Sequence, residues 1–215
     1  MPVPTWVTEA GVLGTWVVGV LAIFGDRIRA MVFKPKLHLE LKSAVGSYTT
    51  QTPPPSTRNE TIENLLVPLQ APKHARYYHL RVTNRARYPT AQDVNVLLLG
   101  IERVGDEKRR GELYVPLVLG WAGSIYPINR SIGSTTEGVA DLFFVREDGL
   151  TFVPVVIPNN FQQTYFGETH LRVTAIARGI DCESNQIRLN IDWDGKWAFD
   201  EDAMAKHVVI TPVEY

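Results

Sequence analysis

The chain has 215 residues, 45% of them hydrophobic and 21% charged, and its formal net charge is −1. This is the composition of a folded globular protein, and it offers no excess of positive charge for binding nucleic acid. The single cysteine, Cys182, excludes an internal disulfide and a cysteine-based zinc site, which suits a reducing compartment.

A long apolar stretch runs from Ala10 to Gly25 and contains no charged side chain. As a helix it would be about 24 Å long, and residues 6–8 extend it toward the roughly 30 Å of a bilayer's hydrocarbon core. Its apolar side chains surround the helix instead of forming one stripe. We therefore expect a membrane-spanning helix, and the alternative is a buried helix of a soluble protein.

The charges on either side of this stretch predict its direction. No lysine or arginine precedes it, whereas basic residues follow it at positions 27, 29, 34, 36 and 42. The positive-inside bias then puts the N-terminus outside and the rest of the chain in the cytoplasm, as in a single-pass protein of the inner membrane. A cleaved signal peptide is disfavoured, because it would begin with a positively charged region. The lipid bilayer is thus an expected partner.

Within the predicted span, small residues recur at every fourth position, at Gly11, Thr15 and Gly19. Such a ridge lets two helix backbones approach closely in lipid, so self-association through this face is one interpretation. The other is that these residues reflect only the usual composition of membrane helices.

Alternation of apolar and polar residues predicts strands over residues 36–42, 75–84 and 94–104. In the second of these, Tyr78, Leu80 and Val82 share one face, and His79 and its alternate neighbours share the other. Residues 43–60 are polar and rich in proline, so we expect them to form a mobile insertion.

Further strands are expected over residues 112–121, 139–145, 150–157, 169–178, 186–193 and 207–213, with one helical turn over 200–206. Pro116 favours an edge position for the first of these, and the charged turn at residues 146–149 is typical of a hairpin.

This series of short strands predicts an all-β soluble domain, an antiparallel two-sheet sandwich of immunoglobulin-like type, preceded by one N-terminal transmembrane helix. A barrel is the alternative. The expected organisation is an anchor with its basic exit over residues 1–33 and a sandwich domain over residues 34–215.

The most acidic part of the sequence lies near its end. Asp192, Asp194, Asp200 and Asp202 could supply carboxylate oxygens to a calcium ion at one end of a sandwich. Their spacing does not match an EF-hand loop, so a solvated turn is the favoured interpretation and no metal or other cofactor is predicted.

Aromatic residues and histidines have simpler explanations than a binding site. Trp193 and Trp197 could form a platform for a sugar or a peptide, but large aromatic side chains more often fill a sandwich core. The five histidines, including His79 and His170 on predicted outward faces, are scattered without metal-ligand spacing. Neither a nucleophile elbow nor a phosphate-binding loop is present, so no catalytic residue is assigned.

Three segments carry a resemblance: Phe33 to Leu37 (FKPKL), Leu80 to Asn84 (LRVTN) leading to Ala91, Val94 and Val96, and Asp192 to Trp197 (DWDGKW). Together they resemble uncharacterised bacterial single-pass membrane proteins with a cytoplasmic immunoglobulin-like β-sandwich. The resemblance implies a bacterial inner-membrane location but no activity, cofactor or catalytic residue.

The leading hypothesis from the sequence is therefore a membrane-anchored, non-catalytic sandwich that binds another protein or its own copy at the cytoplasmic face. Two alternatives come from other classes. One is a hydrolase whose acidic site lies between Asp192 and Asp202 with a histidine brought near by folding, and the other is a sugar- or peptide-binding module that uses Trp193 and Trp197.

Overall fold

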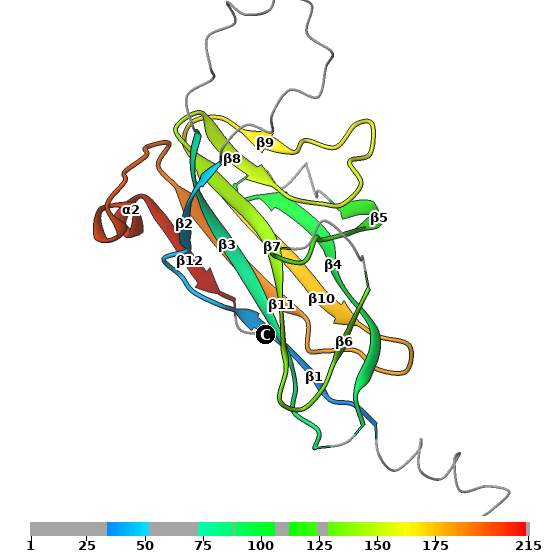
Figure 1. Cartoon of the computed structure of the whole chain (residues 1–215). Coiled ribbons are helices and arrows are strands. Elements are labelled where there is room, and N and C mark those ends of the chain that lie inside the picture. Colours follow the sequence, from blue (N-terminus) through cyan, green and yellow to red (C-terminus); the bar gives the residue numbers. More distant parts are fainter. Residues whose placement is uncertain (1–33, 52–72, 88, 106–111, 124–128, 214–215) are drawn as a thin grey trace, which may run out of the picture.

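The computed structural model describes residues 34–51, 73–87, 89–105, 112–123 and 129–213, which fold into two antiparallel sheets packed face to face (Figure 1). Sheet I contains β1 (Leu37–Leu41), β2 (Ser47–Gln51), β3 (Lys73–Asn84), β7 (Glu137–Arg146), β8 (Gly149–Phe152) and β9 (Thr164–Tyr165). Sheet II contains β4 (Ala91–Arg103), β5 (Glu112–Val118), β6 (Arg130–Ile132), β10 (Thr169–Arg178), β11 (Ile187–Trp193) and β12 (Val208–Pro212). A short helix, α2 (Glu201–His207), joins β11 to β12.

The strand orders are β1-β3-β7-β8-β9 in sheet I and β12-β11-β10-β4-β5 in sheet II. One edge of each sheet is divided between two short strands: β1 and β2 both pair with β3, and β5 and β6 both pair with β4. The predicted two-sheet antiparallel sandwich is therefore present. One sheet of an immunoglobulin domain has the strand order A-B-E-D, in which the edge strand D precedes strand E in the chain. The strands at the corresponding places in sheet I are β1, β3, β7 and β8, and here β8 follows β7, so the order differs from the immunoglobulin pattern.

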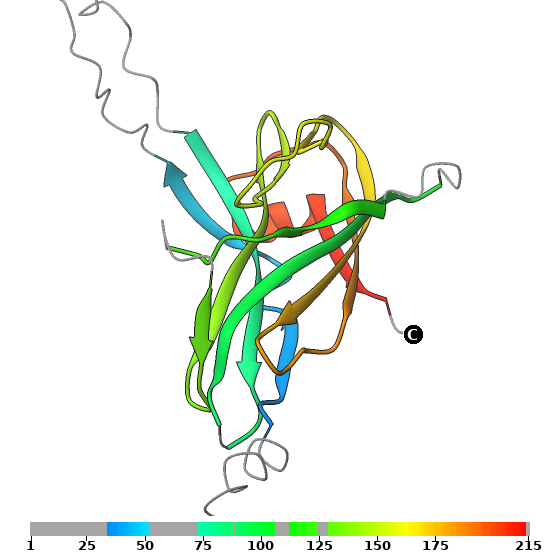
Figure 2. The ribbon, with the colours of Figure 1, turned by 90° about the vertical axis from the view of Figure 1, so that its right-hand side faces the viewer.

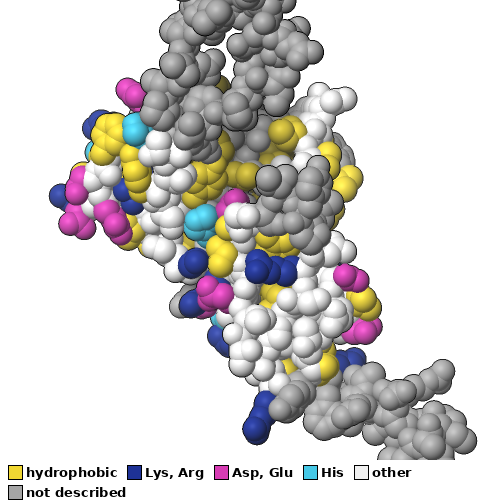
Figure 3. Space-filling view, in the orientation of Figure 1, with side chains coloured by type: hydrophobic (Ala, Val, Ile, Leu, Met, Phe, Trp, Pro, Cys, Tyr) yellow, Lys and Arg dark blue, Asp and Glu magenta, His cyan; other side chains and the backbone are white. Residues whose placement is uncertain are grey.

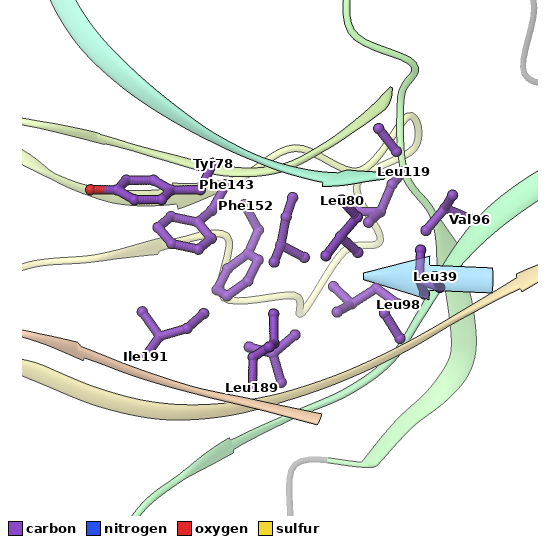
Figure 4. Packing of buried hydrophobic residues seen from close by; sticks show 14 of the residues in the cluster. Leu39, Tyr78, Leu80, Val96, Leu98, Leu119, Phe143, Phe152, Leu189 and Ile191 are labelled. Carbon is purple, nitrogen blue, oxygen red and sulfur yellow. The ribbon is translucent and has the colours of Figure 1, made fainter. Parts of the chain in front are cut away.

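The core lies between the two sheets, which Figure 2 shows as separate layers. Tyr78 and Leu80 of β3 point inward from sheet I and face Leu189 and Ile191 of β11 in sheet II, and all four are at most 1% exposed (Figure 4). This arrangement confirms the inward faces that the alternation of residues 75–84 and 186–193 predicts. The period of two buries one face of each strand because successive side chains point to opposite sides of a sheet.

Two polar groups are buried in this core without a hydrogen-bond partner in the described part of the chain. They are the Nε of Arg76 and the hydroxyl of Tyr78. The two Nη atoms of Arg76 donate to the backbone carbonyls of Val45 and Phe199, at 3.3 and 3.2 Å. Burial raises the pKa of the Tyr78 phenol, and the nearby Arg76 charge only partly offsets this effect.

Residues 119–122 cross from one sheet to the other. The N–H of Leu119 donates to the carbonyl of Val96 in sheet II, at 2.9 Å. Three residues later the N–H of Ala122 donates to the carbonyl of Val139 in sheet I, and the N–H of Asp141 donates back to Gly120, both at 2.8 Å. The two sheets are consequently joined by backbone hydrogen bonds as well as by side-chain packing.

A side chain caps the outer edge of sheet I. Asn185, in the connection between β10 and β11, accepts from the N–H of Leu39 through Oδ1 and donates to the Leu39 carbonyl through Nδ2, each at 3.0 Å. These are the two bonds that a neighbouring strand would make with an edge residue. The amide of Asn185 therefore occupies the place where another strand could pair with β1.

Both edge strands of sheet II are also poor templates for a further strand. In β5, Pro116 lies on the side that faces away from β4, the same side as the carbonyl of Val118, and proline has no N–H to offer there. In β12, Pro212 faces away from β11 in the same manner. The N–H of Val208 is already used, because it donates to Met204 at the end of α2. A proline or an already used donor on an edge removes a position at which another strand could pair, which reduces edge-to-edge association.

The structure differs from the sequence-based expectation at one segment of sheet I. Ser47–Gln51 belongs to the region predicted as a mobile insertion, yet it forms β2 and pairs with residues Lys73 to Tyr77 of β3. The pairing partner and the β-favouring Tyr48, Thr49 and Thr50 outweigh the polar character of the surrounding sequence. The remainder of the predicted insertion lies outside the described residues.

The predicted transmembrane helix requires a correction. Among the described residues no helix is long and apolar enough to cross a membrane. Their helix α2 has seven residues, or about 10 Å against the roughly 30 Å required, and it carries acidic residues in its first turn and basic residues in its last. The predicted fold class is therefore wrong in adding a membrane span to the sandwich. The stretch from Ala10 to Gly25, with Gly11, Thr15 and Gly19, lies outside the described residues.

Candidate functional site

A hollow of about 480 Å³ lies on the outer face of sheet I. It is lined by residues of β2, β3 and β7 and by the end of the crossing segment: Ser47, Tyr48, Thr49, Tyr77, His79, Ala122, Gly123 and Asp141. Figure 3 views the face of the molecule that carries β3 and β7, where charged, histidine and hydrophobic side chains are interspersed. The volume is within the range of about 300–1,000 Å³ that is typical of small-molecule sites.

Two ionisable side chains form a pair in this hollow. His79 of β3 and Asp141 of β7 are cross-strand neighbours, and the Nδ1 of the histidine lies 2.8 Å from the Oδ1 of the aspartate. Their side chains are only 14% and 18% exposed. Because a carboxylate oxygen can only accept, Nδ1 carries the hydrogen, which fixes the orientation of the imidazole ring and leaves Nε2 available.

A bulge brings this pair together. Tyr78 pairs with Phe143, but the next residue of β3, His79, pairs with Asp141, so Leu142 is an extra residue on β7. Leu142 and Phe143 are both buried although they are consecutive, and Asp141 then faces outward. Bulges commonly re-aim a side chain in this way next to functional sites. The N–H of Asp141 is held by the crossing segment, as described above.

The floor of the hollow is aromatic. The rings of Tyr77 and His79, which are two residues apart on β3, are nearly parallel, with an interplanar angle of 10° and centroids 6.1 Å apart. Tyr77 also packs against the ring of Phe144, with the two centroids 5.2 Å apart. Tyr77 and His79 thus add apolar atoms to the polar lining of the hollow.

Several polar atoms that line the hollow have no partner within the described chain. The Nε2 of His79, the Oδ2 of Asp141 and the hydroxyls of Ser47 and Thr49 make no hydrogen bond there, and none of them is sealed from solvent. Ser47 is the register partner of Tyr77, so its side chain lies on the same outward face. The site therefore presents acceptors and hydroxyl groups to whatever occupies it.

An ion-pair ladder borders the hollow along the same face. Arg81 of β3 contacts Glu40 of β1 at 2.6 Å and Glu137 of β7 at 3.8 Å, and Lys42 lies 4.0 Å from Glu137. The cations of this ladder already have carboxylate partners. They thus add little net positive charge beside the hollow.

The four carboxylates predicted as a possible calcium site are not brought together. Asp192 is paired with His170 at 2.8 Å, Asp194 is paired with His207 at 2.8 Å, and Asp200 caps α2 by accepting from the N–H of Ala203. Asp202 is exposed in the first turn of α2. No group of three or more potential ligands among the described residues could hold a metal ion.

Two of these pairs have shifted pKa values. Hydrogen bonds to Asp192 and Glu168 raise the pKa of His170, an exposed side chain that also lines a smaller hollow of about 220 Å³. Partial burial of Asp194 raises its pKa, but hydrogen bonds from His207 and from a backbone N–H outweigh this effect and lower it. Folding thus brings a histidine to the predicted acidic region, on an open surface.

The two tryptophans considered as a platform are not displayed together. Trp193 is 1% exposed and belongs to the core, and its Nε1 donates to the carbonyl of Lys196 at 2.9 Å. Trp197 is partly buried against the core and meets the ring of Phe199 edge to face. Cys182 is partly buried, and burial raises the pKa of its thiol.

Sequence reasoning missed the His79–Asp141 pair. The alternation placed His79 on an outward face, but strict alternation in residues 139–145 would put Asp141 on the same face as Phe143 and Val145, which are buried. What the sequence does not contain is which strand lies beside which, or the bulge that makes the two residues neighbours.

Comparisons with models of protein families, with curated proteins and with solved structures found no match.

Proposed function

We propose that the protein is a non-catalytic binding module and that its recognition site is the hollow on the outer face of sheet I. The observation that carries this proposal is the convergence of unpartnered polar atoms from Ser47, Thr49, His79 and Asp141 on one concave site. A concave site with aromatic surfaces and a few oriented polar groups is the usual form of a ligand site. The pairing with Asp141 orients His79 before any ligand arrives, which reduces the cost of ordering it on binding.

Binding is favoured over catalysis by the contents of the hollow. Asp141 is the one carboxylate among the lining residues, and its Oδ1 is bonded to His79. Hydrolysis of a glycosidic bond normally uses two carboxyl groups that flank that bond. Ser47 makes no hydrogen bond to His79, whereas a nucleophile and its base are expected within hydrogen-bond reach.

The chain offers a matched control for this site. Asp192 and His170 form a second cross-strand pair with the same distance of 2.8 Å between Nδ1 and Oδ1, but their side chains are 46% and 50% exposed and lie on sheet II. Asp141→Asn and Asp192→Asn therefore each remove one carboxylate charge from a histidine–aspartate pair, and His170 keeps a second carboxylate, Glu168, at 3.3 Å. Only the first alters the proposed recognition site.

The experiment is a two-dimensional amide NMR screen of the full chain with monosaccharides, disaccharides, capped dipeptides and simple amines as probes. We expect one class of probe to shift the amides of Ser47, Tyr77 and His79, to shift them less in Asp141→Asn than in Asp192→Asn, and to be recovered unchanged. Probe binding at other surfaces alone, or chemical conversion of the probe, would refute the proposal.

A further inference from the structure

We infer that the ligand of this hollow is an uncharged saccharide of one or a few rings; the inference rests on the proposed function and specifies its ligand.

The unpartnered atoms require a ligand that both donates and accepts hydrogen bonds. The Oδ2 of an ionised Asp141 is a pure acceptor, and the Nε2 of His79 accepts when the ring is neutral and donates when it is protonated, because Nδ1 carries a hydrogen in both forms. The hydroxyls of Ser47 and Thr49 can do either. A hydroxyl group meets all of these requirements with one kind of atom, and two adjacent hydroxyls can satisfy a carboxylate and its neighbour together.

The charge of the site favours a neutral ligand. A protonated His79 and an ionised Asp141 sum to zero, and with His79 neutral the pair carries a single negative charge. Arg81 of the bordering ladder is already bound by Glu40 and Glu137, so it is not a free positive partner for an anion. A cationic ligand would have to share Asp141 with His79, which already occupies one of its oxygens.

The floor suits a sugar ring. A pyranose has an apolar face of C–H groups and a rim of hydroxyls, and flat aromatic surfaces bury the face while polar neighbours bind the rim. The rings of Tyr77 and His79 line the hollow and can contact the C–H groups of a sugar, and the hydroxyls of Ser47 and Thr49 lie on the same outward side of the sheet.

A peptide strand is a poorer occupant. Peptides that bind β-sheet proteins commonly extend an open edge through main-chain hydrogen bonds. Here Asn185 caps β1, and Pro116 and Pro212 face outward from β5 and β12. A peptide that extended β2 or β9 would lie beside sheet I and not in the hollow on its outer face. The hollow instead offers side chains on a sheet face, whose spacing is not that of a backbone ladder.

The test is a titration of the full chain with glucose, galactose, mannose, maltose, cellobiose and lactose, followed by amide NMR, with capped dipeptides and simple amines in parallel. We expect at least one saccharide to shift the amides of the hollow. Its affinity should fall about tenfold or more in Asp141→Asn, because a hydrogen bond to a charged group is lost, and should be unchanged in Asp192→Asn. Thr49→Ala, which keeps the His79–Asp141 pair intact, should weaken binding less.

Each outcome separates the inference from the function on which it rests. If dipeptides or amines bind in the hollow and saccharides do not, the ligand class is overturned and the binding function stands. If no probe shifts the hollow, or if saccharide binding is equal in Asp141→Asn and Asp192→Asn, both are overturned. A dispersed NMR spectrum of each variant shows that the comparison is made between folded proteins.

Discussion

Replacing Asn185 by alanine tests the interpretation that one side chain closes the edge of sheet I. The change removes two hydrogen bonds of 3.0 Å to the backbone of Leu39 and adds no steric conflict. A net hydrogen bond contributes about 0.5–1.5 kcal/mol, so the pair would contribute about 1–3 kcal/mol. Because Asn185 is exposed, water replaces part of the loss, and we expect the free energy of unfolding to fall by about 1–2 kcal/mol.

Urea unfolding measures this effect, and a fall of about 2–8 °C in Tm should accompany it. Asn190→Ala is the matched control: Asn190 accepts one hydrogen bond, from the Nε of Arg172 at 3.1 Å, and touches no strand edge through its side chain. We also expect the Asn185 variant, but not the control, to associate at high concentration, because Leu39 regains a free edge donor and acceptor. Equal losses of stability in the two variants would refute the capping role.

Three further predictions address the core and a surface pair. Tyr78→Phe should leave the stability unchanged or raise it by up to about 1 kcal/mol in urea unfolding, because the buried hydroxyl has no hydrogen-bond partner in the described chain. Gly138→Ala should destabilise by about 1–3 kcal/mol, because the new methyl group would meet the indole of Trp121 at 2.6 Å. The pKa of His170, followed by NMR, should lie above its ordinary value and should fall in Asp192→Asn. Because this pKa is raised in the folded state, the pair stabilises the fold at pH values below the ordinary histidine pKa. That stabilisation is lost as the pH rises through the raised pKa.

These three predictions have clear contradicting results. A large loss of stability in Tyr78→Phe would mean that the hydroxyl has a partner after all. Gly120→Ala serves as the control for Gly138→Ala, since a methyl group at Gly120 meets nothing within 4 Å, and similar losses in both would remove the steric explanation. A His170 titration that is unaffected by Asp192→Asn would show that the pair does not form in solution.

Much of the sandwich follows from local pattern alone. The alternation in residues 75–84 and 169–178 is enough to predict β3 and β10 and their buried faces, and the position of Pro116 predicts an edge strand. The short strand β2 could not be predicted, because its polar sequence acquires strand structure only through pairing with β3. The predicted membrane span is contradicted, because among the described residues no helix is long and apolar enough to cross a membrane.

The candidate site was beyond local pattern. In the sequence, His79 appears as an ordinary outward residue of a strand, and nothing in residues 139–145 marks Asp141 as outward. These two residues are 62 positions apart in the sequence. Their contact depends on the register between β3 and β7 and on the extra residue Leu142. The predicted acidic residues, in contrast, were visible because they are close in sequence, and folding separates them into different pairs.

The crossing segment has a mechanical consequence for the whole molecule. Residues 119–122 are hydrogen-bonded to Val96 in sheet II and to Val139 and Asp141 in sheet I, so the two sheets cannot separate without breaking main-chain hydrogen bonds. Unfolding should accordingly be a single cooperative event. A ligand that binds Asp141 would stabilise the contact between the two sheets. A saturating concentration of this ligand should raise the Tm of the whole protein while the melting curve stays a single transition.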